Sequence, residues 1–511
     1  MPHRPENPTG VAIGQPILPI LRIAARPAAI VFVGLGVFMA GCAILAFGFE
    51  HSTVSVRSID DGSVAKMLWA SIIVATCGAA TWWWGRPTAG QTLSRRDATV
   101  AVSLIWFGSV ALGAIPYILE GGLSLVDALF ESASGFSTTG ATVVMDIEGT
   151  LPHALLLWRS LTQWLGGMGI VVLFVAVFPN LGMGGKHMYR SEAPGHEAKG
   201  LQPRIAETGS VLWRFYLAFT VAEVAVLTAL GMSLFDAVNH AWTTMSTGGF
   251  STHNTSVAAF DSPAIELAIA AFMLIAGVNF GLYFAALSKR GGLDLLKSTE
   301  LRVYLTLALA FTLTLGAVNV GVHGGLVSES FRRSGFMVVS LLTSTGYGIE
   351  DYSLYPSRGL ILLIAIMVIG GCSGSTAGGF KISRVIILGE MMWGGMRQYL
   401  RPNLVHVVRL DRRVVPADVQ KQVATLLFVL GSCLLTGIFL VVTFDGTPIP
   451  TAFGAVLTCV SNMGPAPFHE GADTFASYSS SSKLLFCLLM ILGRLEFLAI
   501  LALLVPGVWR Q

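Results

Sequence analysis

Charged residues are scarce in this sequence. Of its 511 residues, 12% are charged and 53% are hydrophobic, and the mean hydropathy is +0.70. Soluble globular proteins carry about 25% charged residues, so this chain lacks the polar surface that water requires. The apolar excess also excludes intrinsic disorder, and a net charge of +3 provides no basic field for nucleic acid. The composition predicts an integral membrane protein.

Metal-ligand and nucleotide motifs are also lacking. None of the six cysteines forms a CxxC pair, and each falls inside or beside an apolar run, so we read them as small buried hydrophobic residues. The ten histidines show no HExxH or similar spacing, which argues against a transition-metal site. No ATP motif and no convergent titratable groups occur, so we expect neither an enzyme nor a bound cofactor.

Apolar runs of about 20 residues, the length that crosses a bilayer, recur along the chain. Lys and Arg gather in alternate loops, the bias that places basic loops in the cytoplasm. We expect ten spans, a plasma-membrane location and cytoplasmic termini; Arg332 and Arg333 lie outside as the main exceptions. The expected spans lie near residues 28–48, 66–85, 98–118, 153–178, 211–231, 264–287, 303–322, 358–390, 420–443 and 483–506.

Four copies of one unit follow the first two spans. Each copy has a span, a half-length apolar segment, a Ser/Thr/Gly strand and a second span. Gly140, Gly248, Gly346 and Gly464 recur about every 100 to 120 residues, the length of a compact repeat. One Ser-Thr-Gly is usually a turn at a helix end, but four in register indicate one architecture. The expected divisions are an N-terminal two-helix region, 1–90, and pore repeats at 91–185, 186–298, 299–400 and 401–511.

We therefore expect an all-α membrane protein with four units around one pore. Irregular backbone at membrane depth is tolerated only where it is buried or lines a water-filled cavity. Glycine lets carbonyl oxygens point at the pore axis and replace the water shell of a cation, and the half-helices point their negative C-terminal ends there. The candidate ion-binding residues are Thr138, Thr139, Gly140, Thr247, Gly248, Thr345, Gly346, Asn462 and Met463. Threonine hydroxyls can add oxygens or hold neighbouring strands.

These strands resemble the Trk/Ktr/HKT superfamily of cation transporters, and most closely its TrkH type. Gly346-Tyr347-Gly348 matches the GYG of potassium-channel filters. Supporting stretches are 163–169, 203–208, 370–381 and 493–496, and the resemblance covers nearly the whole chain. It implies potassium uptake across the bacterial inner membrane, with K+ as the substrate. It also implies a homodimer and a cytosolic nucleotide-binding regulatory ring of TrkA type, in addition to membrane lipids as surroundings.

The resemblance assigns roles to particular strands. In this superfamily a glycine in the first filter, here Gly140, accompanies potassium, whereas a serine there accompanies sodium-permeable relatives. The fourth strand, Asn462-Met463-Gly464-Pro465, departs from the Thr-x-Gly pattern but matches the superfamily's asymmetric fourth filter. A less selective Na+/K+ pathway, a cation-coupled symporter, and a secondary transporter of another solute are the alternatives.

The span at 358–390 contains a glycine-rich run that should break the helix, because each interior glycine costs about 1 kcal/mol. The resemblance implies an intramembrane loop that obstructs the pore under the filter and moves when the pore opens. Helix packing through small residues and a P-loop, which Phe380 interrupts, are the competing interpretations. The expected gating-loop residues are Gly370, Gly371, Gly374, Ser375, Thr376, Gly378, Gly379 and Lys381.

Arg494 lies near the middle of the last expected span, where a charge costs at least about 2.5 kcal/mol unless it faces water or a partner. We expect it to face the pore, where the resemblance implies a barrier to the cation; the alternative is an ion pair with another span. Glu496, two residues away, should point elsewhere. The basic loops 179–210 and 391–421 are candidate docking surfaces for the regulatory ring.

Overall fold

The computed structural model describes residues 17–52, 61–88, 95–177, 205–287, 297–411, 413–468 and 474–497. Helices packed side by side make up almost all of this part of the chain, and a short antiparallel pair, β1 (Arg409–Leu410) and β2 (Arg413–Val414), is its one sheet. Among the described helices, six are long and apolar enough to cross a membrane. The expected multi-pass membrane protein is thereby confirmed.

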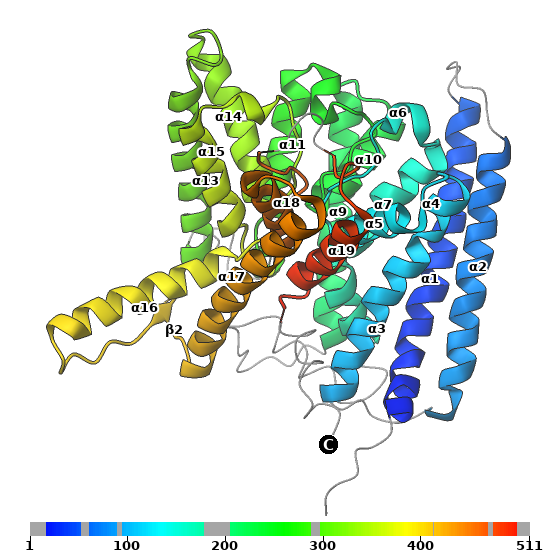
Figure 1. Cartoon of the computed structure of the whole chain (residues 1–511), viewed down its shortest axis with the longest axis horizontal. Coiled ribbons are helices and arrows are strands. Elements are labelled where there is room, and N and C mark those ends of the chain that lie inside the picture. Colours follow the sequence, from blue (N-terminus) through cyan, green and yellow to red (C-terminus); the bar gives the residue numbers. More distant parts are fainter. Residues whose placement is uncertain are drawn as a thin grey trace, which may run out of the picture.

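Two long helices precede the repeats, α1 (Ile17–Ser52) and α2 (Asp61–Gly85), followed by the short η1 (Arg86–Thr88). They run antiparallel along one edge of the molecule (Figure 1). Glycines let the two backbones touch: a Cβ on Gly78 would lie 2.7 Å from Val33 N, and one on Gly36 would lie 2.9 Å from Ser71 O. Small residues at helix contacts are the usual means of close packing in membranes.

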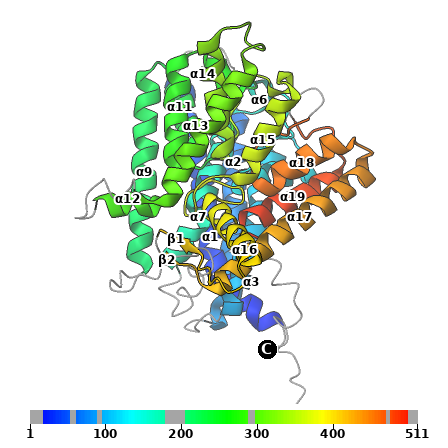
Figure 2. The ribbon, with the colours of Figure 1, turned by 90° about the vertical axis from the view of Figure 1, so that its left-hand side faces the viewer.

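Each repeat consists of an outer helix, a half-length pore helix and an inner helix. In Figure 2, α9, α11, α13 and α14 of repeats 2 and 3 stand on one side and α17 to α19 of repeat 4 lie on the other. Repeat 1 contains α3 (Arg95–Gly113), α4 (Ile115–Leu119), α5 (Leu125–Phe136), α6 (Ile147–Thr150) and α7 (His153–Val177). Repeat 2 contains α9 (Ile205–Ala229), α10 (Leu234–Met245), η3 (Ser256–Phe260), α11 (Pro263–Ala276) and α12 (Phe280–Leu287). Repeat 3 contains α13 (Thr299–Asn319), α14 (Val327–Leu342), η5 (Tyr352–Leu354), α15 (Ser357–Ile369) and α16 (Ile382–Leu400). Repeat 4 contains α17 (Ala417–Asp445), α18 (Ile449–Ser461) and α19 (Ser480–Arg494). The division of the chain into domains at the stated residues stays a prediction.

The inner helices of repeats 2 and 3 are interrupted, and the last helix of repeat 4 ends earlier than expected, with residues 498–506 of its expected span outside the described residues. The break between α15 and α16 agrees with the glycine-rich run in the sequence. The continuous span expected at 264–287 is wrong, because α11 ends at Ala276 and Asn279 Oδ1 accepts a hydrogen bond from Gly281 N (2.8 Å) at the start of α12. The span expected at 483–506 is also not one helix: α19 ends at Arg494, and Glu496 and Phe497 are both left-handed, with φ of 55° and 60°.

The arginines that oppose the charge bias are neutralised locally. Arg332 and Arg333 lie on α14 and both pair with Glu329, at 2.6 Å and 2.5 Å. Arg332 also pairs with Glu266 of α11, and Arg333 lies 3.5 Å from Glu350. Because carboxylates surround them, these two arginines add little net positive charge to their side of the membrane.

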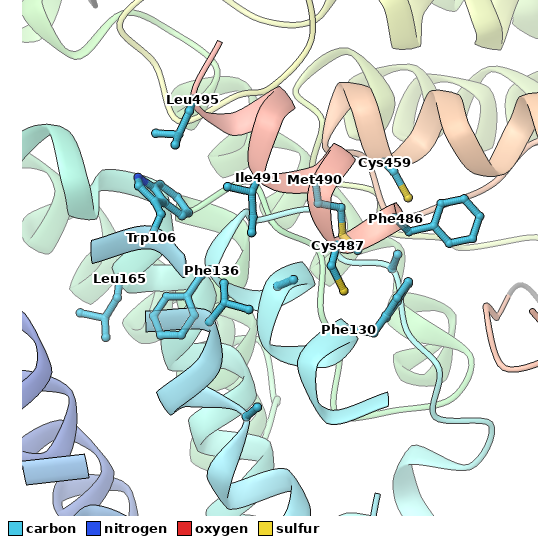
Figure 3. Close-up of a cluster of buried hydrophobic side chains, with 14 of the residues drawn as sticks. Trp106, Phe130, Phe136, Leu165, Cys459, Phe486, Cys487, Met490, Ile491 and Leu495 are labelled. Carbon is cyan, nitrogen blue, oxygen red and sulfur yellow. The ribbon is translucent and has the colours of Figure 1, made fainter. Parts of the chain in front are cut away.

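Repeat 4 packs directly against repeat 1. Figure 3 shows Phe486, Met490 and Ile491 of α19 lying over Phe130 and Phe136 of α5, with all five side chains buried. The phenylalanines Phe130 and Phe486 meet edge to face, with ring centroids 6.5 Å apart. The first and last repeats are therefore neighbours, as a ring of four units requires.

The cysteines are free in the described part of the chain, and four of the six are buried as predicted, Cys42, Cys372, Cys459 and Cys487. The prediction is wrong for Cys77, which is exposed, and Cys433 is half-buried. Cys77 lies on α2 at the edge of the molecule, where the outward face of the helix exposes apolar side chains such as Trp69 and Ile72.

Candidate ion pathway

The four strands share one turn after their pore helices. In each, one residue adopts a left-handed backbone, and the next amide donates a hydrogen bond back to a carbonyl five residues earlier. The left-handed residues are Thr138 (φ 55°), Thr247 (54°), Ser344 (57°) and Asn462 (54°). The returning bonds are Thr139 N to Ser134 O (2.9 Å), Gly248 N to Thr243 O (2.9 Å), Thr345 N to Ser340 O (2.8 Å) and Met463 N to Thr458 O (3.0 Å). This common turn fixes which residues are equivalent.

The register makes Gly140, Gly249, Gly346 and Gly464 equivalent, two residues after the left-handed position. The first three have φ of 83°, 75° and 84°, a region that favours glycine. Grouping Gly248 with the other glycines from sequence is therefore wrong by one residue. Gly248 occupies the position of Thr139 and Thr345, because the turn after α10 places Thr247 in the left-handed position.

Each equivalent glycine lies against the backbone of the next strand. A Cβ on Gly140 would lie 2.1 Å from Gly248 O, and one on Gly249 would lie 1.8 Å from Thr345 O. A Cβ on Gly346 would lie 2.9 Å from Gly464 N, and one on Gly464 would lie 3.1 Å from Gly140 O. These contacts run from repeat 1 through 2, 3 and 4 and back to 1. The strands thus close a ring that leaves little or no room for a side chain at these positions.

Hydroxyl groups of the pore helices hold the strands beyond the ring. In three repeats a hydroxyl donates to the carbonyl of the residue after the equivalent glycine. The bonds are Ser134 Oγ to Ala141 O (2.5 Å), Ser340 Oγ to Tyr347 O (2.8 Å) and Thr458 Oγ1 to Pro465 O (2.5 Å). In repeat 2, Thr243 Oγ1 instead contacts the Tyr347 hydroxyl at 2.5 Å. In these three repeats the carbonyl after the equivalent glycine is thus hydrogen-bonded to its own pore helix.

The threonine side chains proposed from sequence hold neighbouring groups. Thr139 Oγ1 contacts Ser137 Oγ (2.7 Å) and accepts from Asn462 Nδ2 of the fourth strand (3.0 Å). Thr345 Oγ1 contacts Thr343 Oγ1 at 2.8 Å, and Thr247 Oγ1 donates to a backbone carbonyl, that of Ser246, at 2.6 Å. Thr139 thus contacts a neighbouring strand, whereas Thr345 and Thr247 contact groups of their own segments. The ion-binding role of these hydroxyls stays a prediction.

A buried ion pair joins the first two strands beyond the ring. Glu131 and Arg159 are 0% and 2% exposed, and Arg159 Nε lies 3.1 Å from Glu131 Oε2. The carboxylate accepts from Val143 N (2.7 Å) and the Thr142 hydroxyl (2.6 Å), both of strand 1. Arg159 donates to Ser251 O of strand 2 (3.1 Å). The two charges are hydrogen-bonded at both ends, which is what makes a buried pair tolerable.

Gln163 of α7 provides a second brace. Its Nε2 donates to Gly248 O at 2.8 Å, and its Oε1 accepts from Phe250 N at 3.0 Å. The side chain is fully buried. One amide thereby fixes two backbone groups of strand 2 from the inner helix of repeat 1.

The glycine-rich loop lies beneath the pore-helix ends. Thr376 Oγ1 donates to Met245 O at the end of α10 (3.0 Å), and Gly379 N donates to Ser461 O at the end of α18 (3.0 Å). Gly378 N donates to Ser344 Oγ, just after α14, at 2.5 Å. The loop thus contacts three of the four pore-helix ends.

Glycine is required where the loop's two limbs cross. A Cβ on Gly370 would lie 2.3 Å from Gly378 O, and one on Gly379 would lie 2.7 Å from Gly370 Cα. The remaining predicted loop residues belong to the same turn. Gly371 lies against Ala377, and Gly374 lies against Asn279. Ser375 Oγ donates to Cys372 O (2.6 Å), and Lys381, with φ of 78°, directly precedes α16. The loop is therefore one compact unit that brings all eight predicted residues together.

Arg494 reaches this loop from the end of α19. Its guanidinium donates to Thr376 O and to the carbonyls of Gly166 and Gly167 in α7, each at 2.8 Å. Arg494 is the last residue of α19, and a positive charge at a helix C-terminus is favourable. The sequence had predicted a position near the middle of a span. Glu496 pairs with Arg384 of α16 at 2.5 Å, in line with its expected separate orientation.

Known proteins resemble this chain over most of its length. The profile of the TrkH family, described as cation transport protein, matches residues 64–507. The chain belongs to the TrkH family. It is 36% identical to the Trk system potassium uptake protein TrkH of Salmonella typhimurium, over 88% of this chain and 93% of that protein. It is 35% identical to TrkH of Escherichia coli K12 with the same two coverages. The crystal structure of the potassium transporter TrkH from Vibrio parahaemolyticus superposes with a TM-score of 0.83 at 30% identity, covering 96% of this chain and 99% of that one.

Membership of the TrkH family confirms the expected all-α transporter fold and a cation transport protein rather than an enzyme. The braces made by Glu131, Arg159 and Gln163 were missed from sequence, as was Glu300 of α13. Glu300 Oε1 accepts from Ser373 N (2.7 Å) and Ser383 N (3.2 Å) and so holds both limbs of the loop. A charged residue within an apolar run was the one available signal, and it identifies no partner.

Proposed function

We propose that this TrkH-family chain takes up potassium across the membrane through the ring of four strands. The observation that supports this most strongly is the closed sequence of contacts from Gly140 through Gly249 and Gly346 to Gly464. Backbone carbonyls at such a ring can replace the water shell of a cation. The relatives named above are potassium uptake proteins, which favours potassium over another cation. The driving force would be the membrane potential, about 2.3 kcal/mol per charge for each 100 mV.

The loop at 370–381 is the proposed gate. Its donors lie under the pore helices, and Arg494 holds it through Thr376 O at 2.8 Å. A positive charge beneath the ring would also repel a cation leaving it. Opening would then require the loop to move away from Met245 O and Ser461 O.

The assembly is proposed by analogy with the Trk systems to which the relatives belong. We expect a homodimer, association with other Trk components, and a nucleotide-binding regulatory ring on the cytoplasmic face of a bacterial inner membrane. The basic segment 391–421, which includes the projecting end of α16 and the β1–β2 pair (Figure 1), is one candidate docking surface. Most of the other, 179–210, lies outside the described residues.

Tracer uptake into liposomes tests the proposal. The purified chain in potassium-loaded liposomes should take up rubidium, and external potassium should block this more strongly than external sodium. Gly346→Asp should abolish uptake, because a Cβ at Gly346 already lies 2.8 Å from Pro465. Gly321→Asp is the matched control, since Gly321 is exposed with nothing within 4 Å of a Cβ.

Equal block by both ions would favour the less selective Na+/K+ pathway instead. If wild type shows no uptake even with its regulatory partner present, or if the two aspartate variants behave alike, the proposed pathway is wrong.

Gly140→Ser tests selectivity at the first strand. A Cβ at Gly140 would lie 2.1 Å from Gly248 O, so the serine must displace the carbonyls that it faces. We expect the ratio of potassium to sodium uptake to fall. An unchanged ratio at equal protein level would remove Gly140 from the selective site.

A further inference from the structure

Three consecutive tryptophans end α2, and an arginine lies over each ring. Arg26 Cζ is 4.8 Å from the ring centre of Trp82, Arg86 Cζ is 4.4 Å from that of Trp83, and Arg22 Cζ is 6.0 Å from that of Trp84. Arg22 and Arg26 lie one turn apart on α1, and Arg86 follows α2 in η1. Three positive charges therefore lie at the same end of the two-helix pair, each over a different tryptophan ring.

Gly85 makes these contacts between α1 and α2 possible. A Cβ there would lie 2.7 Å from Arg26 Cγ and 3.3 Å from Arg22 O. The absent side chain lets the end of α2 approach α1, so that arginines of one helix reach the rings of the other. Thr88 Oγ1 donates to Gly85 O at 2.8 Å and holds the turn that carries Arg86.

Within the described residues, these guanidinium groups have no anionic partner. No carboxylate in the described part of the chain pairs with Arg22, Arg26 or Arg86, unlike Arg159, Arg332 and Arg384. The Nε atoms of Arg22 and Arg26 are shielded from solvent and have no hydrogen-bond acceptor within that same part. A cation–π contact uses the face of the guanidinium and leaves its N–H edge free to donate. The described residues thus leave this site short of hydrogen-bond acceptors and of negative charge.

Its surroundings indicate where the acceptor comes from. The α1–α2 pair forms the edge of the molecule (Figure 1), and α2 exposes large apolar side chains there, including Trp69 (64%) and Ile72 (51%). Trp83 is 69% exposed at the end of this apolar face. Tryptophan is enriched at the headgroup level of a bilayer. The three arginines therefore lie where lipid tails give way to headgroups.

We propose that Arg22, Arg26 and Arg86 bind the headgroup phosphates of anionic phospholipids in the cytoplasmic leaflet. The guanidinium edges would donate to the phosphate oxygens, while the tryptophan rings hold the guanidinium faces and contact the glycerol region. Charge complementarity favours an anionic over a zwitterionic lipid, and the apolar face of α2 favours a lipid over free phosphate. This site is separate from the potassium pathway, so the proposal stands or fails independently of it.

Native mass spectrometry of the full chain in detergent tests the site. The protein would be titrated with phosphatidylglycerol, with phosphatidylcholine and with inorganic phosphate. Basic residues near an anionic surface contribute about fivefold each in affinity, so R22Q/R26Q/R86Q should weaken the tightest phosphatidylglycerol binding roughly 100-fold. The matched control is R397Q, which removes a single Arg–Trp pair on α16, with Arg397 Cζ 4.9 Å from the Trp393 ring. R397Q should bind as wild type does.

Three results would overturn the proposal: equal binding of the two lipids by wild type, undiminished phosphatidylglycerol binding by the triple variant, or an equal loss in R397Q. Phosphate that competes for the site at the lipid's own concentration would also overturn it, because the ligand would then be free phosphate. If the triple variant does not fold, R86Q alone serves, since Arg86 is exposed; it should weaken phosphatidylglycerol binding about fivefold.

Discussion

Alanine at Gly249 and alanine at Gly248 add the same methyl group to adjacent positions of one strand, and we expect different outcomes. At Gly249 the φ of 75° is left-handed, which costs an alanine about 1–2 kcal/mol. Its Cβ would also lie 1.8 Å from Thr345 O, inside the closest real approach of 3.0 Å. Relieving such an overlap typically costs about 1–3 kcal/mol. The combined cost is roughly 2–5 kcal/mol, and relief of the overlap requires the carbonyls of the ring to move.

At Gly248 the added methyl meets a side chain. Its Cβ would lie 2.4 Å from Gln163 Cδ, and the backbone there has no positive φ. Gln163 can move at the cost of its two hydrogen bonds, each worth about 0.5–1.5 kcal/mol. The strand loses a brace, but no carbonyl of the next strand is displaced.

Rubidium uptake into potassium-loaded liposomes separates the two variants. At equal amounts of folded protein, Gly249→Ala should lose uptake, whereas Gly248→Ala should retain a measurable part of it with a reduced preference for potassium. Gly389→Ala is the control, because Gly389 lies in α16 with nothing within 4 Å of a Cβ. Greater loss in Gly248→Ala than in Gly249→Ala would refute the register, and equal loss would refute the assigned difference in cost.

Three further outcomes are expected. Arg494→Ala removes the donor to the loop and should raise the initial rate of rubidium uptake; an unchanged or lower rate at equal protein would contradict the barrier. Glu131→Gln leaves its buried arginine partner without a carboxylate, which costs about 3–5 kcal/mol; a thermal unfolding midpoint equal to wild type would contradict this. The carboxylates of Asp236 and Glu148, 3.6 Å and 2.7 Å from the ring nitrogens of His253, raise its pKa, so its contribution to stability is complete below its ordinary pKa of about 6.5 and is lost as the pH rises past the higher folded value. His253→Gln should flatten that pH dependence of the unfolding midpoint, and an unchanged profile would exclude His253 as its source.

The positions of most spans and the break in the third inner helix could be predicted because both depend on local sequence. A run of about 20 apolar residues identifies a span wherever it packs, and the glycines from Gly370 to Gly379 disfavour a helix in any context. The interruption at Gly277–Asn279 could not be predicted in this way. It depends on the loop of repeat 3, whose Cys372 N donates to Gly277 O at 3.0 Å across the molecule.

The predicted alignment of the four strands is wrong at strand 2 for a related reason. Thr247-Gly248 reads like Thr139-Gly140, and local sequence prefers that alignment. The equivalence is set by where α10 ends, and the turn that follows puts Thr247, not Gly248, in the left-handed position. The braces share this dependence on three-dimensional contacts, since Gln163 lies 85 residues from the carbonyl that it binds.

The contacts of the loop suggest how a pore that favours cations can be held closed without a bulky plug. Pore-helix C-terminal ends carry partial negative charge, which would stabilise a cation beneath the ring. In this structure two of those carbonyls, Met245 O and Ser461 O, accept hydrogen bonds from the proposed gate. In the proposed mechanism, the loop and a desolvated cation would therefore compete for the same acceptors. When the loop leaves, a cation arriving from the ring would take the place of the loop's hydrogen-bond donors at these carbonyls, which would lower the cost of opening. Arg494 would oppose opening, because it holds the loop through Thr376 O.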